Sequence, residues 1–141
     1  MLVKMKNFVR KKNICVLSTA SGNKPYCSLM AYITDATCKE VYMVTHKNTT
    51  KFNNLQNNPW VSLLIDSRET QPRSNAQALT IGGVFVPLVD EGKKQKIRDK
   101  MLESFPHMKE FIHHPESELI RIKINSFLLL DGLTQSHFMS I

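Results

Sequence analysis

Short apolar runs with a two-residue repeat alternate along the chain with polar turns rich in glycine, proline and asparagine. Residues 119–125 show the repeat plainly, with isoleucine at every second position and charged residues between. A period of two is that of an extended strand whose side chains point alternately to opposite faces. The pattern therefore predicts strands over residues 14–20, 26–33, 40–46, 60–66, 77–86, 119–125 and 127–131.

Other segments repeat their apolar residues every three or four positions, which is the period of an amphipathic helix. These predicted helices are residues 2–12, 49–57 and 91–105, with a shorter helical piece from Pro106 to His113. In the helix over 91–105, Ile97, Met101 and Phe105 share one face. Asp90 stands directly before that helix, where a side chain that caps the first turn is expected.

The order of these elements indicates a fold class. Seven strands, most of them joined by short turns, predict a small antiparallel barrel decorated with helices, a mainly β fold with helices (α+β). The pair Gly82-Gly83 predicts a bulge or bend inside the strand over 77–86. No linker, repeat or low-complexity stretch divides the chain, so we expect a single domain over residues 1–141. The longest apolar runs are far shorter than the roughly 20 residues of a membrane-spanning helix.

Composition narrows the class of protein. Hydrophobic residues make up 42% and charged residues 22%, as in a folded globular chain. The three cysteines, Cys15, Cys27 and Cys38, form no CxxC pair, which excludes a zinc knuckle and a thioredoxin-type motif. Free thiols and an N-terminus without a continuous apolar segment favour a cytoplasmic location. We expect Cys27 to be a small packed residue.

The net charge of +7 predicts a surface that attracts anions such as nucleic acids, phosphorylated ligands and acidic membranes. The basic residues cluster at 4–12 and at 93–100. The second cluster lies in a predicted helix, where the lysines fall mostly on the solvated face. No zinc-finger pattern or ribonucleoprotein-type aromatic motif accompanies either cluster. We therefore do not expect a dedicated nucleic-acid site and keep a basic nucleic-acid binder only as a third alternative.

Residues 41–55 carry the most informative chemistry, because they form a predicted strand, a polar turn and the start of a helix. Thr49, Thr50 and Lys51 stand at the helix N-terminus, where backbone N–H groups are free and the helix dipole favours an anion. Two hydroxyls and one ammonium group at this place predict a phosphate site. The alternative is that Thr49 only caps the helix and Lys51 is solvated.

Three stretches, in their order and spacing, resemble the pyridoxamine-5′-phosphate-oxidase-like FMN-binding split barrels. They are residues 24–30, 41–63 and 77–82. The most specific part is a strand, a threonine, a polar turn, Ser/Thr-x-Lys, a short apolar helix, Asn-Pro and another strand. The resemblance implies an antiparallel split β-barrel of the FMN-binding type. It also implies a homodimer with FMN held between the subunits.

The resemblance further implies roles for individual positions. Residues 28–31 would lie along the flavin, and Val44 and Thr45 would also contact it. Thr50 and Lys51 would bind the FMN phosphate. Without the resemblance, alternating strand residues of this kind are more often part of the core. Together with Thr49 from the helix argument, and with a glutamine that would reach the flavin from the partner chain, the candidate cofactor-binding residues are Ser28, Leu29, Met30, Ala31, Val44, Thr45, Thr49, Thr50, Lys51 and Gln77.

The sequence departs from the vitamin-B6 oxidase itself at several of these positions. That enzyme has arginine where this chain has Ser28 and Thr50, so bidentate phosphate contacts are lost. Its lysine for the substrate phosphate corresponds to Ile33. The candidate replacements for the lost guanidinium groups are Arg68 and Arg73 in the polar loop. Genuine oxidation of pyridoxamine phosphate is therefore not expected.

The expected function is that of an FMN-dependent oxidoreductase with a nicotinamide such as NAD(P)H as donor; no catalytic side chain is evident. The alternative is a non-enzymatic FMN- or haem-binding module. Residues 133–141 favour this alternative, because they lack the tryptophan and arginine of the oxidase and contain His137, as some haem-handling relatives of the fold do. No metal is expected, since His107, His113 and His114 have no cysteine nearby to complete a zinc site.

Overall fold

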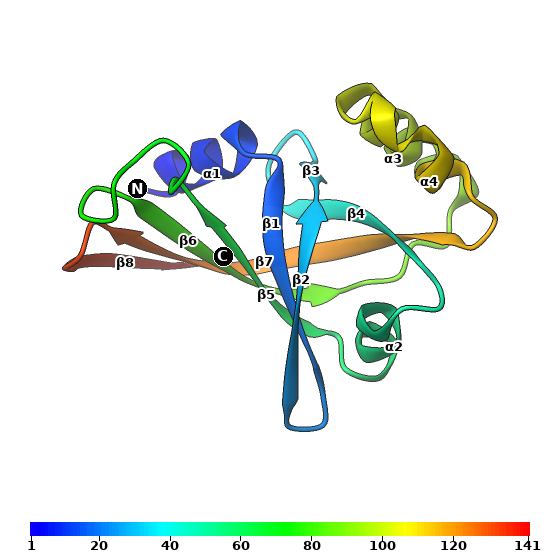
Figure 1. The fold of residues 1–141 in the computed structure, drawn as a ribbon, viewed down its shortest axis with the longest axis horizontal. Coiled ribbons are helices and arrows are strands. Elements are labelled where there is room, and N and C mark those ends of the chain that lie inside the picture. The colour runs from blue at the N-terminus through cyan, green and yellow to red at the C-terminus, as the bar shows by residue number, and fades with distance from the viewer.

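The computed structural model describes residues 1–141 as one curled, antiparallel, eight-stranded sheet with four α-helices (Figure 1). The strands are β1 (Ile14–Ser21), β2 (Lys24–Ala31), β3 (Ile33–Thr34), β4 (Glu40–His46), β5 (Trp60–Asp66), β6 (Gln77–Phe85), β7 (Ser117–Asp131) and β8 (Gln135–Ser140). The helices are α1 (Leu2–Lys11), α2 (Thr50–Asn57), α3 (Glu91–Ser104) and α4 (Lys109–His113), with a 3₁₀ turn at Pro106–Met108.

The sheet forms a half-barrel whose two ends approach each other. Its strand order is β2-β1-β5-β6-β7-β4-β3, and β8 pairs with β7 off this path. Because the sheet curls, the first strand of this order, β2, comes into contact with β4 near the other end. We call the opening between β2 and β4 the split. It is the place where the barrel does not close by hydrogen bonding.

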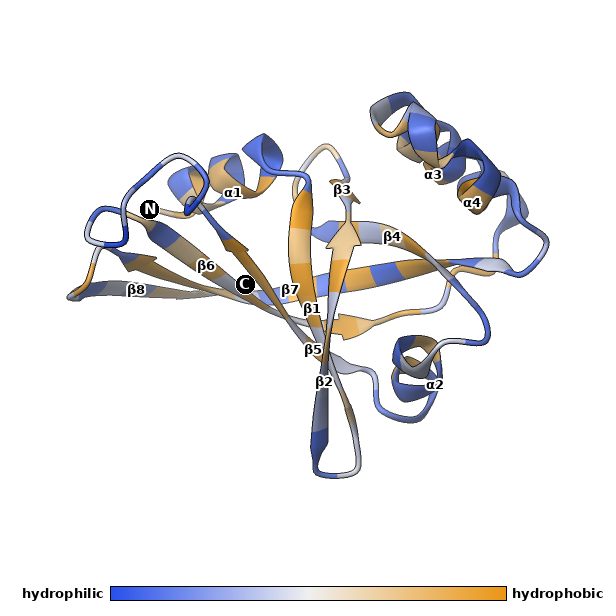
Figure 2. Ribbon diagram, in the orientation of Figure 1, coloured by the Kyte–Doolittle hydropathy of each residue, from blue (hydrophilic) through white to orange (hydrophobic).

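The core fills the inside of the half-barrel, because the alternating apolar residues of each long strand point inward. Leu17, Leu63, Ile81 and Phe127 are fully buried there, and α1 covers one end. A second apolar cluster lies between α3, α4 and the outer face of β4. Figure 2 shows this arrangement as hydrophobic strands and helices whose hydrophilic sides face outward. The predicted helix face of Ile97, Met101 and Phe105 is confirmed, since all three are buried.

Most of the predicted elements are confirmed. The strands over 40–46 and 60–66 begin and end as predicted, and Asp90 caps α3 by accepting a hydrogen bond from the Gly92 amide at 3.1 Å. The register of β6 shifts between Gly82 and Gly83, as the bulge prediction requires. None of the helices is long and apolar enough to cross a bilayer.

Three differences from the prediction have physical reasons. The strands expected over 119–125 and 127–131 are one strand, β7, because the bulge at Gly82/Gly83 absorbs the extra residue Asn125. The strand expected over 26–33 is interrupted at Tyr32, whose amide bonds the Asn13 carbonyl and whose hydroxyl bonds the Val9 carbonyl. Strand β8 was not predicted, since its sequence is largely polar and it forms by pairing with β7.

Candidate functional site

Free strand edges border the split on both sides. β2 pairs only with β1, so its other edge has no strand partner. β3 pairs with β4 only through Val41 and Tyr42, which leaves residues 43–46 of β4 unpaired on that side. Backbone N–H and C=O groups on free edges are strong hydrogen-bonding groups in need of partners. The split can therefore offer donors and acceptors to the polar rim of a flat ligand.

Helix α2 lies against β1 and β2 and starts directly after β4. The Thr49 hydroxyl fixes its first turn, because it accepts a hydrogen bond from the Phe52 amide at 3.3 Å and donates one to the His46 carbonyl at 3.0 Å. The buried Phe52 and Leu55 side chains anchor the helix in the core. The Asn54 amide group donates to the Thr19 hydroxyl of β1 at 3.1 Å, which holds the helix beside the hairpin β1–β2.

The N-terminus of α2 keeps free donors after this capping. The Phe52 amide bonds the Thr49 hydroxyl and the Asn53 amide bonds the Thr49 carbonyl, so the amides of Thr50 and Lys51 remain without a helical partner. The Thr50 side chain is exposed, and Lys51 forms no ion pair. Thr49 therefore caps α2, and its contact with a phosphate stays a prediction. The groups left for an anion are those of Thr50 and Lys51.

The capping bond gives a stability prediction. Changing Thr49 to alanine should lower the free energy of unfolding by about 1 kcal/mol, because an N-cap side chain is lost. The matched control is Thr50→Ala, which removes an exposed threonine without a capping bond and should change stability by less than about 0.5 kcal/mol. Urea unfolding of the purified proteins measures both. Equal losses in the two variants would show that the cap contributes nothing specific.

The side chains predicted on β2 and β4 differ widely in accessibility. Leu29 is 74% exposed, and Ser28 and Ala31 are half-buried. Met30 packs in the barrel core, and Val44 packs under α3 and α4. Thr45 is buried with its hydroxyl 3.2 Å from that of Thr49. For Met30, Val44 and Thr45, only the backbone at the strand edges is available to a ligand in the split.

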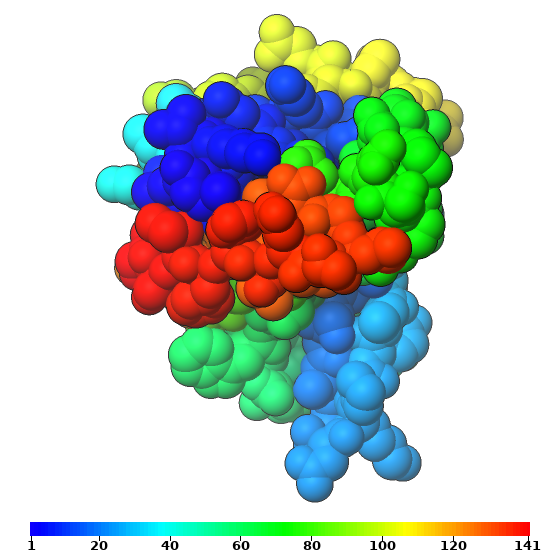
Figure 3. Space-filling model, turned by 90° about the vertical axis from the view of Figure 1, so that its left-hand side faces the viewer, coloured from blue at the N-terminus to red at the C-terminus, as the bar shows by residue number.

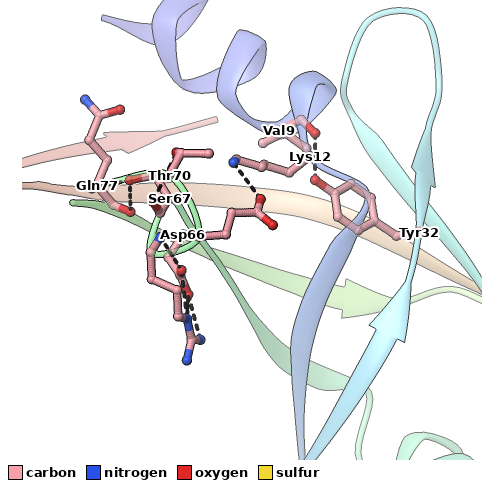
Figure 4. Close-up of polar contacts among 9 residues, drawn as sticks. Val9, Lys12, Tyr32, Asp66, Ser67, Thr70 and Gln77 are labelled. Atoms are coloured by element: carbon pink, nitrogen blue, oxygen red, sulfur yellow. Dashed lines mark hydrogen bonds and ion pairs between the residues drawn. The ribbon is translucent and has the colours of Figure 1, made fainter. Parts of the chain in front are cut away.

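Gln77 lies at the opposite end of the sheet from α2. It opens β6, while Phe85 ends that strand and stacks edge-on against Phe52 of α2 at 6.3 Å. Eight residues of extended chain separate Gln77 and Phe85, about 25 Å at the usual rise per residue. Figure 4 places Gln77 beside the loop of Ser67 and Thr70, below α1. Within one chain, Gln77 is therefore not brought together with the other predicted residues.

The two loop arginines do not replace the missing phosphate contacts within the chain. Arg68 forms a bidentate ion pair with Asp66, with Nη2 2.7 Å from Oδ2, and this hydrogen bonding holds the pKa of Asp66 below its usual value. Asp66 ends β5, about 20 Å from the start of that strand near α2. Within one chain, Arg68 therefore lies far from α2. Arg73 is exposed in the same loop.

Cys15, Cys27 and His46 differ in their accessibility and in their contacts. Burial raises the pKa of the Cys15 thiol to about 12, so this group is not a nucleophile at neutral pH. Cys27 is exposed on β2, and the expectation of a packed residue is wrong. Sequence reasoning missed His46, which ends β4, stacks on Phe111 and His114 at 4.4 and 4.7 Å, and has a buried, unbonded Nε2.

A cavity of about 670 Å³ lies outside the split, between α2 and α3. Its walls are mainly apolar, with Phe52, Phe85 and Leu88 among them. The ion pair of Lys94 and Glu118, 3.5 Å apart, borders it. No three histidine, cysteine or acidic side chains anywhere in the chain gather as a metal site would require. The free donors of α2 and the strand edges are therefore the stronger candidate site.

Comparison with known proteins places the chain in a family. Residues 1–131 match the sequence profile of the family described as pyridoxamine 5′-phosphate oxidase. No protein of curated function matches the chain in sequence. Among solved structures, a haem-binding protein from Mycobacterium smegmatis has a TM-score of 0.83 at 16% identity, over 97% of this chain and 56% of that one. The chain thus spans little more than half of the Mycobacterium protein.

Two further solved structures match along most of both chains. An FAD-binding protein from Mesorhizobium loti has a TM-score of 0.77 at 18% identity, over 92% of this chain and 91% of that one. General stress protein 26 from Bacillus anthracis has a TM-score of 0.71 at 19% identity, over 99% and 98%. Both likenesses cover more than nine-tenths of this chain and therefore concern its fold as a whole. The chain belongs to the pyridoxamine 5′-phosphate oxidase family and has its split-barrel fold.

Proposed function

We propose that this chain is an FMN-binding flavoprotein, an oxidoreductase of the family that does not oxidise pyridoxamine phosphate. The observation that carries the proposal is the N-terminus of α2, where two amides without helical partners, the exposed Thr50 and the half-buried, unpaired Lys51 lie beside two free strand edges. A phosphate matches such a group of donors, because amides at a helix start and an ammonium all stabilise an anion. The strand edges suit the polar rim of the flavin ring.

The protein's own contribution would be binding and orientation. Bound FMN would supply the hydride or electron transfer, with NAD(P)H as the proposed donor. The Thr50 and Lys51 groups would hold the phosphate, and the edges of β2 and β4 would fix the plane of the ring. Ile33, which is half-buried, provides no charge for a substrate phosphate. This difference supports a substrate other than pyridoxamine phosphate.

A homodimer is part of the proposal, and a row of side chains on the outer face of the sheet supports it. Strand pairing sets these residues side by side: Leu29, Val16, Leu64, Thr80, Leu128 and Phe138. Leu29, Leu64, Leu128 and Phe138 are 74%, 36%, 37% and 64% exposed. A parallel row carries only small residues: Cys27, Ser18, Ser62, Gly82, Ser126 and Ser140.

An apolar row beside a row of small side chains suits a second sheet, because small residues permit close approach and the apolar row then loses its contact with water. The hairpin of β1 and β2 also projects from the body of the molecule, as Figure 3 shows, so it can reach over a partner. A second copy of the chain is the proposed partner. Such a dimer would also give the partner's Gln77 access to a flavin.

The dimer gives a prediction of its own. Changing Leu64 to glutamate should weaken dimerisation more than about tenfold, because a buried leucine contributes roughly 1.5–3 kcal/mol and an unpaired charge opposes burial. Val89→Glu is the control, since Val89 is 86% exposed in the loop before α3 and lies outside the row. Sedimentation equilibrium measures both variants. A monomeric wild-type protein, or equal weakening by both substitutions, would contradict the proposed interface.

The absorbance spectrum of the protein tests the function itself. We expect flavin bands to remain with the protein after incubation with FMN and gel filtration, and steady oxidation of NAD(P)H when an acceptor is present. Flavin bands without NAD(P)H oxidation would favour a non-enzymatic FMN-binding module. A sharp haem band after incubation with haemin, with no retained flavin, would favour the haem-binding alternative. A protein that stays colourless after incubation with FMN and after incubation with haemin would contradict the proposal.

A further inference from the structure

A groove runs between the C-terminal ends of α1 and α3, across the short strand β3. It consists of two adjoining hollows of about 400 and 460 Å³ that share Ile33, Thr34 and Ser104 as lining residues. Both helices lie at the same end of the molecule, with β3 between them (Figure 1). The fold thereby brings together the two basic clusters, which are more than 80 residues apart in the chain.

Basic side chains line this groove from both helices. Arg10, Lys11 and Lys12 come from the end of α1, and Lys100 comes from α3. Lys12 bonds Glu69 at 3.0 Å (Figure 4), whereas Lys11 and Lys100 form no ion pair. The guanidinium of Arg10 donates only to uncharged oxygens. The positive charge of the groove is therefore largely uncompensated.

The basic surface continues along α3 away from the groove. Lys93 and Lys100 are seven residues apart and so lie on the same side of the helix, about 10 Å from each other. Lys96 lies between them on the neighbouring row. None of the three is in the last turn of α3, so neutralising the helix dipole does not account for them. The line of charge extends well beyond the size of a single phosphate group.

Acidic groups around the groove reduce this charge without cancelling it. Glu103 lines the groove, and Asp99 lies on the exposed side of α3. Asp35 follows β3, but its carboxylate already accepts hydrogen bonds from the Lys39 and Glu40 amides, each at 2.8 Å. The cations of α1 and α3 outnumber these carboxylates. A ligand with several regularly spaced negative charges complements such a surface.

We propose, against the expectation from the sequence alone, that this groove binds the phosphate backbone of a nucleic acid, because only the fold brings the two basic clusters together. The hydroxyls of Thr34 and Ser104, which line both hollows, can donate to phosphate oxygens between the flanking cations. The groove has no exposed aromatic ring on which bases could stack, since Tyr32 is buried and bonded, so binding would be independent of sequence. A membrane surface is a poorer partner, because the apolar residues Met5 and Val9 of α1 are buried in the core.

Fluorescence anisotropy with a labelled oligonucleotide of about 20 nucleotides tests this proposal. We expect binding at about 50 mM salt that falls steeply by 200 mM, with a log–log slope of about −3 for four or five neutralised phosphates. The variant Lys96→Glu with Lys100→Glu should bind at least about tenfold more weakly. The control Lys24→Glu with Lys109→Glu changes the net charge equally, on the hairpin and α4, and should stay within about twofold.

Single-stranded and duplex oligonucleotides are compared to identify the form that the groove prefers, and either preference supports the proposal. No binding at about 50 mM salt, or equal losses in the groove and control variants, would overturn it. Complete displacement by inorganic pyrophosphate at constant ionic strength would also overturn it, because that result identifies a site for small anions. Retention of FMN by the groove variants is measured in parallel and should not change, so failure here and failure of the flavin proposal are distinguishable.

Discussion

The Lys51→Ala variant should bind FMN about 10- to 100-fold more weakly than the wild-type protein while binding riboflavin almost equally well. The expected loss follows from the ammonium group at the start of α2, which has no ion-pair partner in the chain. A hydrogen bond to a charged group contributes roughly 1.5–3 kcal/mol, and about 1.4 kcal/mol corresponds to a tenfold change in affinity. Riboflavin lacks the phosphate, so the affinity for riboflavin should not change.

Titration of flavin fluorescence measures both affinities. Lys47→Ala is the control, because Lys47 is an exposed lysine in the turn before α2 and does not belong to the first turn of the helix. Its effect on FMN binding should remain within about twofold, because an exposed ammonium without direct contact to the phosphate is screened by water and salt. Unchanged FMN affinity in the Lys51→Ala variant would show that Lys51 does not bind the phosphate. Equal losses of FMN and riboflavin would point to damage to the helix instead.

The second large effect concerns stability. Leu63→Ala should lower the free energy of unfolding by about 2–5 kcal/mol, because Leu63 is fully buried at the centre of β5 and its removal leaves a cavity in the barrel core. Leu133→Ala provides a matched control, since the same atoms are removed from a side chain that is 66% exposed in the turn between β7 and β8. The control should change stability by less than about 0.5 kcal/mol.

Urea unfolding at one fixed protein concentration measures both leucine variants, because dimerisation would otherwise alter the apparent stability. Similar losses for Leu63→Ala and Leu133→Ala would contradict the assignment of the core to the inside of the half-barrel. The same outcome would weaken the account of the site, because the split exists only if the sheet curls around that core.

The local sequence pattern was sufficient to predict the strand and the helix that surround the site. The strand over 40–46 and the helix start at Thr49 were predictable, because alternation, a capping threonine and two inward apolar residues all act within a few positions. The bulge at Gly82-Gly83 was also predictable from two adjacent glycines. Strand β8 was not, because residues such as Gln135 and Ser136 have little strand preference and pair only because the edge of β7 is available.

The local sequence pattern could not predict the parts of the site that depend on strand order. The free edges exist because β2 and β4 lie near opposite ends of the sheet order yet come into contact, which no short stretch of sequence encodes. The separation of Gln77 from α2 follows from the same topology. The burial of Met30 and Val44 in two different apolar clusters likewise depends on what packs over each face of the sheet.

Equilibrium dialysis of the purified wild-type protein against FMN and against riboflavin tests the central claim most directly. The account predicts one retained FMN per chain and riboflavin bound at least about tenfold more weakly, since the start of α2 would hold the phosphate through charge-assisted hydrogen bonds. Equal affinity for the two flavins would contradict the phosphate site. Failure to retain either flavin would contradict the proposed function as a whole.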